Sequence, residues 1–174
     1  ILTALGVGGL ALALALQDTL SNLFAGVHIL AADQIRTGDF IKLDSLEEGF
    51  VRDVSWRNTT IETMKGNMVV IPNSKISAAI ITNYHLPLPE MNVLVEVGVA
   101  YGTDLDVVEE TLIEIARDVA GRVEGAVPDF EPVVRFKGFG QSSIECFVVL
   151  RVQEFAYQHA VRTEVVRQIH RVFA

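Results

Sequence analysis

The side chains most often used for catalysis and metal binding are scattered along this chain. The four histidines are far apart and do not have the spacing of metal ligands. They are His28, His85, His159 and His170. The single cysteine, Cys146, cannot form an intrachain disulfide or a thiolate zinc cluster. We therefore expect no metal and no cofactor, and we interpret the acidic pairs Glu47-Glu48 and Glu109-Glu110 as solvated faces.

One glycine-rich segment, GFGQS at 138–142, has a distant likeness to a phosphate-binding loop. It lacks the lysine and the following helix of a P-loop, so we predict a hairpin turn instead. Ser74, Ser142 and Ser143 have no neighbouring signature of an activated nucleophile. The residues therefore predict that the protein is not an enzyme.

The N-terminal residues favour a different chemistry, the exclusion of water. The first sixteen carry no charge, and at about 100° per residue Leu10 and Leu14 share one helical face. The small residues that flank this stripe are Gly6, Gly8, Ala4, Ala11, Ala13 and Ala15. Small residues let helices approach closely in lipid, and a ring of such helices would point the leucine stripe at a central axis. Apolar constrictions block ions by dewetting, so the pattern predicts a pore-lining helix.

Two other readings of this apolar run stay open, a buried helix of a soluble core and the apolar region of a signal peptide. The run is shorter than the roughly 20 residues of a transmembrane helix. The chain begins at Ile1 without a methionine, so we expect the apolar segment to continue upstream. No basic residue precedes Arg36, which argues against a signal peptide.

A change of pattern follows at Gln17 and Asp18. Asp18 or Thr19 is suited to cap a new helix. The apolar residues of that helix would be Leu20, Leu23, Phe24, Val27 and Leu30. We predict a break or kink near Gln17-Asp18, with the second segment lying near the membrane surface. The alternative is one continuous helix that leaves the membrane.

Residues 33–84 predict a small β-domain, a barrel or a sandwich, because short apolar runs alternate with turn residues. The expected strands are Phe40 to Leu43, GFVRDVSW from Gly49, Thr59 to Thr63 and MVVIP at 68–72. Lys65-Gly66-Asn67 predicts a turn, and Pro72-Asn73 predicts that the last strand ends in a tight turn. Two prolines in residues 85–90 indicate a linker between domains.

Residues 91–174 predict an α+β domain with the ferredoxin-like order βαββα. Alternating valines from Val93 to Val99 indicate a strand, and further strands are expected at 133–136 and 144–152. The first helix has the apolar stripe Leu105, Val108, Leu112, Ile115 and Val119, and the closing helix has Val161, Val165, Ile169 and Val172. Since the chain stops within the closing helix, we expect a further strand to be missing.

The charge of the chain is acidic and unevenly distributed. The formal charge is −8, with −1 in residues 1–32, −2 in residues 33–90 and −5 in residues 91–174. An acidic balance disfavours a nucleic-acid partner, which is held largely through its phosphates. It favours cations near the protein instead.

Four motifs, in order, resemble those of the small-conductance mechanosensitive channel family. They are GLALALALQDTLSNLFAG, RTGDFIKL, EGFVRDVSWRNTTIET and GNMVVIPNSKI. The resemblance covers nearly the whole chain. It implies an α+β membrane protein with a kinked pore-lining helix (1–32), a β-domain (33–84) and an α/β domain (91–174). It also implies seven identical subunits, a bacterial inner membrane, and a cytoplasmic location for residues after about 33.

By this resemblance, Leu10 and Leu14 match the two leucine rings that constrict the closed pore. Gly9, Ala11 and Ala13 match small residues through which neighbouring helices interlock. The family's best-known pattern has glycine where this chain has Asp18, which puts the kink in doubt. The upstream helices and the C-terminal segment of the family are absent from this sequence.

The sequence is compatible with three classes of function. The first is a channel opened by membrane tension, with lipids, ions and small solutes as its partners. The second is a membrane scaffold that uses the same helix packing without conducting. The third is a soluble RNA-binding module built on the small β-domain, which lacks the dense basic and aromatic face that such a module needs.

Overall fold

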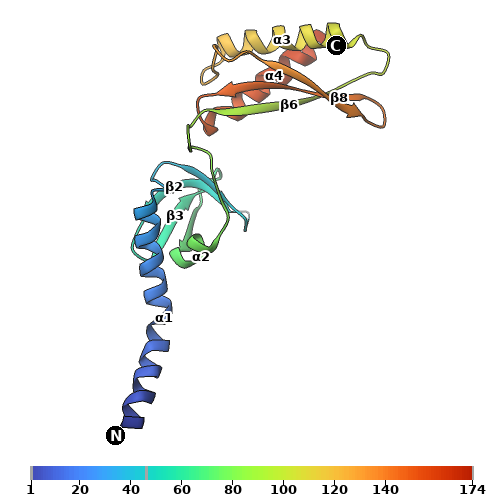
Figure 1. The fold of residues 1–174 in the computed structure, drawn as a ribbon. Helices are drawn as coiled ribbons and strands as arrows, with labels where there is room; N and C mark the ends of the chain where they lie inside the picture. Colours follow the sequence, from blue (N-terminus) through green and yellow to red (C-terminus); the bar gives the residue numbers. More distant parts are fainter. Residues whose placement is uncertain (1, 46, 174) are drawn as a thin grey trace. The chain divides into compact units, whose positions relative to one another are not determined.

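The computed structural model describes residues 2–45 and 47–173. The chain divides into two compact units, Ile1–Tyr84 and His85–Ala174. In Figure 1 the first unit is drawn in blue to green and the second in green to red. The first contains a long helix and a sheet, and the second contains a sheet with two long helices.

The first unit is an antiparallel sheet attached to a 31-residue helix, α1 (Leu2–Ala32). Its strands are β1 (Phe40–Leu43), β2 (Glu48–Val54), β3 (Asn58–Glu62), β4 (Met68–Pro72) and β5 (Ile81–Asn83). They form one sheet in the order β4-β3-β2-β1-β5, with every neighbouring pair antiparallel. The four expected strands are confirmed, and the short edge strand β5 was not expected.

The tight turn expected at Pro72-Asn73 is wrong, because a short helix, α2 (Asn73–Ala78), begins there directly after β4. Pro72 is the last residue of β4, which is an edge strand of the sheet, where proline is tolerated because it lacks only an outward N–H. Gly66, by contrast, has a φ of 81° in the β3–β4 connection, so the turn predicted at Lys65-Gly66-Asn67 is confirmed.

The core of the first unit is built from alternate strand residues and the two helices. The buried members of this cluster are Ile29, Ile35, Ile41, Leu43, Val51, Ile61, Ile71 and Ile76. Phe40 is also fully buried and contacts the rings of Phe50 and Tyr84 edge-on. Phe40 and Ile41 are neighbours in β1, so their side chains point to opposite faces of the sheet. Both are fully buried, and the sheet is therefore covered on both faces near β1.

The second unit has the predicted order βαββα. Its elements are β6 (Met91–Val99), α3 (Leu105–Arg122), β7 (Val133–Phe139), β8 (Ile144–Val152), a 3₁₀ turn η1 (Phe155–Tyr157) and α4 (Gln158–Phe173). The strands pair antiparallel in the order β6-β8-β7. The Asp104 carboxylate accepts from the N–H of Asp106 at 3.0 Å and so caps α3.

The hairpin turn predicted at 138–142 is confirmed, because β7 and β8 are paired and their connection is closed by a bond from Gly140 N to Ser143 O at 2.8 Å.

Both long helices pack on one sheet face, since the buried residues of β6 and β8 alternate regularly. Helix α3 contacts β8 and β7, whereas α4 contacts β6. Cys146 is buried in this core, and burial raises the pKa of its thiol.

Candidate pore helix and its anchor

The first half of α1 is exposed on all sides. Residues 6–21 are all exposed, although most are apolar. Leu10 and Leu14 are each 63% exposed, and Leu12, which lies about 200° around the helix from Leu10, is 61% exposed. Figure 1 shows this half of α1 without a neighbouring element of the first unit. A soluble core helix would bury one side, whereas no described residue of the chain covers this segment.

The predicted packing residues lie in this same exposed segment. They are Gly6, Gly8, Gly9, Ala11, Ala13 and Ala15. A Cβ built on any of the three glycines would have no atom within 4 Å apart from the helix itself. Their small size is therefore not required by contacts of the described chain, and close contact with another helix would explain it.

Among the described helices, one is long and apolar enough to cross a membrane, by length and composition. It is the segment Gly6–Ala32 of α1, which has 27 residues and a mean hydropathy of 1.4. Only 17% of its most apolar window is buried. A helix of this length spans about 40 Å at 1.5 Å per residue, which exceeds a hydrocarbon core of about 30 Å.

The break expected at Gln17 and Asp18 is wrong, because α1 is helical through both residues. A kink without loss of the helix at these two residues stays a prediction. Asp18 does not cap a new helix. Its backbone carbonyl accepts a hydrogen bond from Asn22 Nδ2 at 2.8 Å, within the helix. The alternative of one continuous helix is therefore the conformation in this structure.

The second half of α1 is anchored to the β-domain through a polar contact with α2. Asn22 is 8% exposed, and its Oδ1 accepts from the backbone N–H of Ser74 at 2.9 Å. The N–H groups of a first helical turn have no partner within their helix, so the Asn22 side chain satisfies one of them. The bond joins residues 52 positions apart in the sequence.

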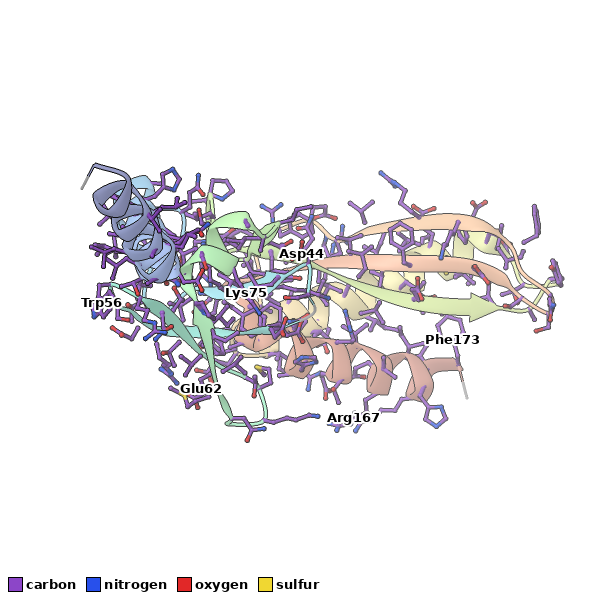
Figure 2. All side chains as sticks on the ribbon, turned by 90° about the horizontal axis from the view of Figure 1, so that it is seen from below. Asp44, Trp56, Glu62, Lys75, Arg167 and Phe173 are labelled. Atoms are coloured by element: carbon purple, nitrogen blue, oxygen red, sulfur yellow. The ribbon has the colours of Figure 1, made fainter. Side chains whose placement is uncertain are left out.

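One turn further along, the backbone of α1 closely approaches the β2–β3 loop at Gly26. A Cβ at this position would lie 2.7 Å from the backbone oxygen of Trp56 and 2.6 Å from Asn73 Nδ2. The loop thus touches the helix backbone itself, and Figure 2 shows Trp56 beside α1. Only glycine fits this contact without displacement.

Behind Gly26 lies a fully buried amide. Asn73 Nδ2 donates to the carbonyl of Ser55 at 2.8 Å, and Asn73 Oδ1 accepts from Thr59 Oγ1 at 2.9 Å. Together these bonds connect the start of α2 with the β2–β3 loop and with β3. No periodic pattern predicts this cluster, because Asn22, Asn73 and Thr59 are isolated polar residues in separate segments.

The helix ends in a compact polar turn. Asp33 has a φ of 52°, a left-handed conformation that aspartate tolerates better than most residues. Its carboxylate accepts from Arg36 Nε at 2.8 Å, and this hydrogen bond holds the pKa of Asp33 below its ordinary value. The buried Asp39 carboxylate accepts from the Arg36 backbone and from Asn83 Nδ2, so the turn is tied to β5.

Two family models match the chain. A model described as the β-domain of mechanosensitive ion channels matches residues 18–86. A model described as the C-terminal part of the mechanosensitive ion channel MscS matches residues 93–174. The first match thus includes the anchored half of α1, and the second covers nearly the whole second unit.

Curated relatives and solved structures agree with these matches. The small-conductance mechanosensitive channel MscMJ of Methanocaldococcus jannaschii is 33% identical over 155 residues, which is 89% of this chain and 42% of the relative. A small-conductance mechanosensitive channel of Edwardsiella ictaluri is 39% identical over 107 residues, 62% of this chain and 37% of that protein. The closed-state crystal structure of Helicobacter pylori MscS matches with a TM-score of 0.81 and 28% identity, over 97% of this chain and 64% of that chain. The chain spans less than half the length of these two curated relatives.

Proposed function

Since the chain belongs to the small-conductance mechanosensitive channel family, we propose that it is part of a homo-oligomeric ion channel opened by membrane tension. On osmotic downshock such a channel releases ions and small solutes. We propose a ring of seven copies, as in the family resemblance, in a bacterial inner membrane. Residues after about 33 would then lie on the cytoplasmic side.

The observation that carries this proposal is the contrast between the two halves of α1. Residues 6–21 expose leucines and small residues on every side, whereas Asn22, Ala25, Gly26 and Ile29 are buried against the β-domain. An apolar helix of this kind is stable when lipid and neighbouring helices surround it. The anchored half fixes the helix to a folded domain outside the membrane.

In the proposed channel, Leu10 and Leu14 form two rings that close the pore. A ring of leucine side chains excludes water from a narrow pore and so blocks ions without a charged barrier. The residues that flank the stripe would allow the close helix contacts that a narrow pore requires. Gln17 and Asp18 would be the place where the helix bends in the assembled channel, without losing its helical hydrogen bonds.

Membrane tension favours whichever state occupies more area in the plane of the bilayer. It can therefore open the channel only if the open and closed states differ in that area. Tilting and separating the α1 helices would enlarge the ring until water enters between the leucines. The contacts of Asn22 and Gly26 would carry such a movement to the β-domain, because they join the helix backbone to α2 and the β2–β3 loop.

Reconstitution of the full-length protein in lipid bilayers tests this proposal. We expect discrete current steps that begin when suction stretches an excised patch, and a ring-shaped assembly in low-resolution images of the same preparation. A ring without current under any tension that the patch survives would favour the non-conducting scaffold. Cells lacking their own tension-gated channels should also survive osmotic downshock better when they express this protein.

A further inference from the structure

The β2–β3 loop, residues 55–57, presents a tryptophan and an arginine to its surroundings. Trp56, the single tryptophan of this sequence, is 56% exposed, and Figure 2 shows it at the outer edge of the first unit. Arg57 is exposed and takes part in no ion pair among the described residues. We propose that these two side chains contact the headgroup region of the lipid bilayer. The proposal rests on the proposed function, because it requires α1 to lie in a membrane.

The backbone of this loop is held firmly by the fold. The Ser55 N–H donates to the carbonyl of Asn58 at 2.9 Å, and the Asn58 N–H donates to Ser55 Oγ at 3.2 Å. The carbonyl of Arg57 accepts from the Asn73 N–H at 2.9 Å. The fold thus fixes the loop backbone and leaves the two side chains at its tip exposed. A loop that is already ordered loses little conformational entropy when it binds a surface.

The loop meets α1 between two charged positions of the chain. It touches the helix backbone at Gly26, which lies eight residues after Asp18 and seven residues before Asp33. At 1.5 Å per residue these separations are about 12 Å and about 10 Å along the helix. The headgroup region on each side of a bilayer is about 5–8 Å thick, so it fits within this interval.

The outer side of α1 is apolar at the level of the loop. Leu20, Phe24 and Val27 are exposed, and at about 100° per residue they lie on the side of the helix opposite to the buried Asn22 and Ile29. Phe24 is 68% exposed. The apolar surface of the first half of α1 therefore continues past the first charged residue. A bilayer that covers this stripe also reaches the level of the loop.

The chemistry of the two side chains fits lipid headgroups. Tryptophan has an apolar ring and a polar N–H, and it is enriched where hydrocarbon meets water. A guanidinium binds phosphate through two parallel hydrogen bonds, and anionic lipids attract arginines near the membrane surface. The occupant follows from continuity, because the loop touches the helix Gly6–Ala32, which is long and apolar enough to cross the bilayer.

Fluorescence of Trp56 in the full-length protein, reconstituted in bilayers, tests the contact. The difference between the unaltered protein and Trp56→Phe isolates the emission of this tryptophan. Lipids with bromine near the headgroup end of their acyl chains should remove most of that emission, whereas aqueous iodide should remove little. Quenching by iodide without quenching by lipid would place the loop in water and overturn the proposal. Protection from both quenchers would also overturn it, because another part of the assembly would then cover Trp56.

The matched control places a tryptophan at the other end of the same strand. Met64→Trp, made together with Trp56→Phe, lies in the β3–β4 connection, and position 64 is exposed like position 56. Since β3 runs between the two connections, this tryptophan should not be quenched by brominated lipid. Equal quenching by lipid at both positions would contradict a contact made specifically by the β2–β3 loop.

The role of Arg57 is tested separately, with Trp56 in place. In the unaltered protein, quenching by brominated lipid should rise as the fraction of phosphatidylglycerol is raised, and Arg57→Gln should abolish that rise. Lys65→Gln removes an exposed positive charge at the opposite end of β3 and should preserve it. An unchanged rise in Arg57→Gln would overturn the assignment of Arg57.

These measurements separate the lipid contact from the proposed function. Current under tension without quenching of Trp56 by lipid refutes the contact alone. Quenching by lipid in an assembly that never conducts supports the contact and contradicts the proposed channel.

Discussion

Asn22 of α1 accepts a hydrogen bond from the backbone N–H of Ser74 at the start of α2, at 2.9 Å. The same amide donates to the carbonyl of Asp18 one turn earlier, at 2.8 Å. One side chain therefore links the segment that leads into the exposed apolar half of α1 with the helix that follows β4. The Asn22 side chain thus holds the start of α2 against α1.

Replacing Asn22 with alanine should loosen α2. The Ser74 N–H would lose its acceptor, and an unsatisfied, partly buried donor costs about 1–3 kcal/mol. We expect faster hydrogen exchange at the first residues of α2 in the full-length protein, measured by mass spectrometry. Asn22→Asp keeps an acceptor oxygen and serves as the control. Equal exchange in the alanine variant and the unaltered protein would mean that this bond does not hold α2.

Replacing Gly26 with alanine should separate α1 from the β2–β3 loop. The new Cβ would meet backbone atoms of Trp56, which cannot rotate away, and overpacking of this kind costs about 1–3 kcal/mol. A lower midpoint of thermal unfolding is expected. Gly121→Ala in α3 is the matched control, because a Cβ there meets no atom within 4 Å and alanine is the better helix former. It should leave the midpoint unchanged or raise it.

Much of this fold was predictable because its patterns are local. Alternating valines at 93–99 and the stripe from Val108 to Val119 correspond to β6 and α3, since each element buries one face on the same core. The break at Asp18 was predicted from a capping residue, but such a residue starts a helix only if the preceding chain leaves helical geometry. The leucine- and alanine-rich residues before Asp18 have high helix propensity. One aspartate inside a helix therefore destabilises it less than ending the helix and starting a new one would.

The anchor could not be predicted, for a different reason. Asn22 and Ser74 are 52 residues apart, and neither belongs to a periodic pattern. Gly26 is one of several glycines in α1, and its contact with Trp56 depends on how the sheet lies against the helix. The roles of Leu10 and Leu14 stay predictions, because their proposed partners are lipids and other copies of the chain.

The charge of the second unit should bias the channel toward cations. Residues 91–174 contain thirteen acidic and eight basic residues, and by resemblance they surround the route of ions into the pore. A negative wall concentrates cations, and salt weakens the effect because the Debye length falls from about 30 Å at 0.01 M to about 10 Å at 0.1 M. Reversal potentials under a salt gradient should therefore show a mild cation preference that is largest in dilute salt. An anion preference in dilute salt would contradict this expectation.

Helix packing in the pore should be sensitive to small increases in size. Ala11→Val or Ala13→Val would overpack the proposed helix contact at a cost of about 1–3 kcal/mol. We expect an altered opening threshold or poor assembly, measured in patches and by native gel electrophoresis. Leu12→Val, on the opposite face, is the control and should change little. If all three positions tolerate valine equally, the proposed orientation of α1 in the ring is wrong.

The tension at which the channel opens, measured in excised patches with Leu10→Ser and Leu14→Ser, tests the central claim most directly. A serine ring wets the constriction, so each variant should open at lower tension than the unaltered channel, and the double variant at the lowest. Leu12→Ser introduces the same polarity on the opposite face and should not lower the threshold in this way. Thresholds that stay unchanged in both single variants would contradict a gate formed by Leu10 and Leu14.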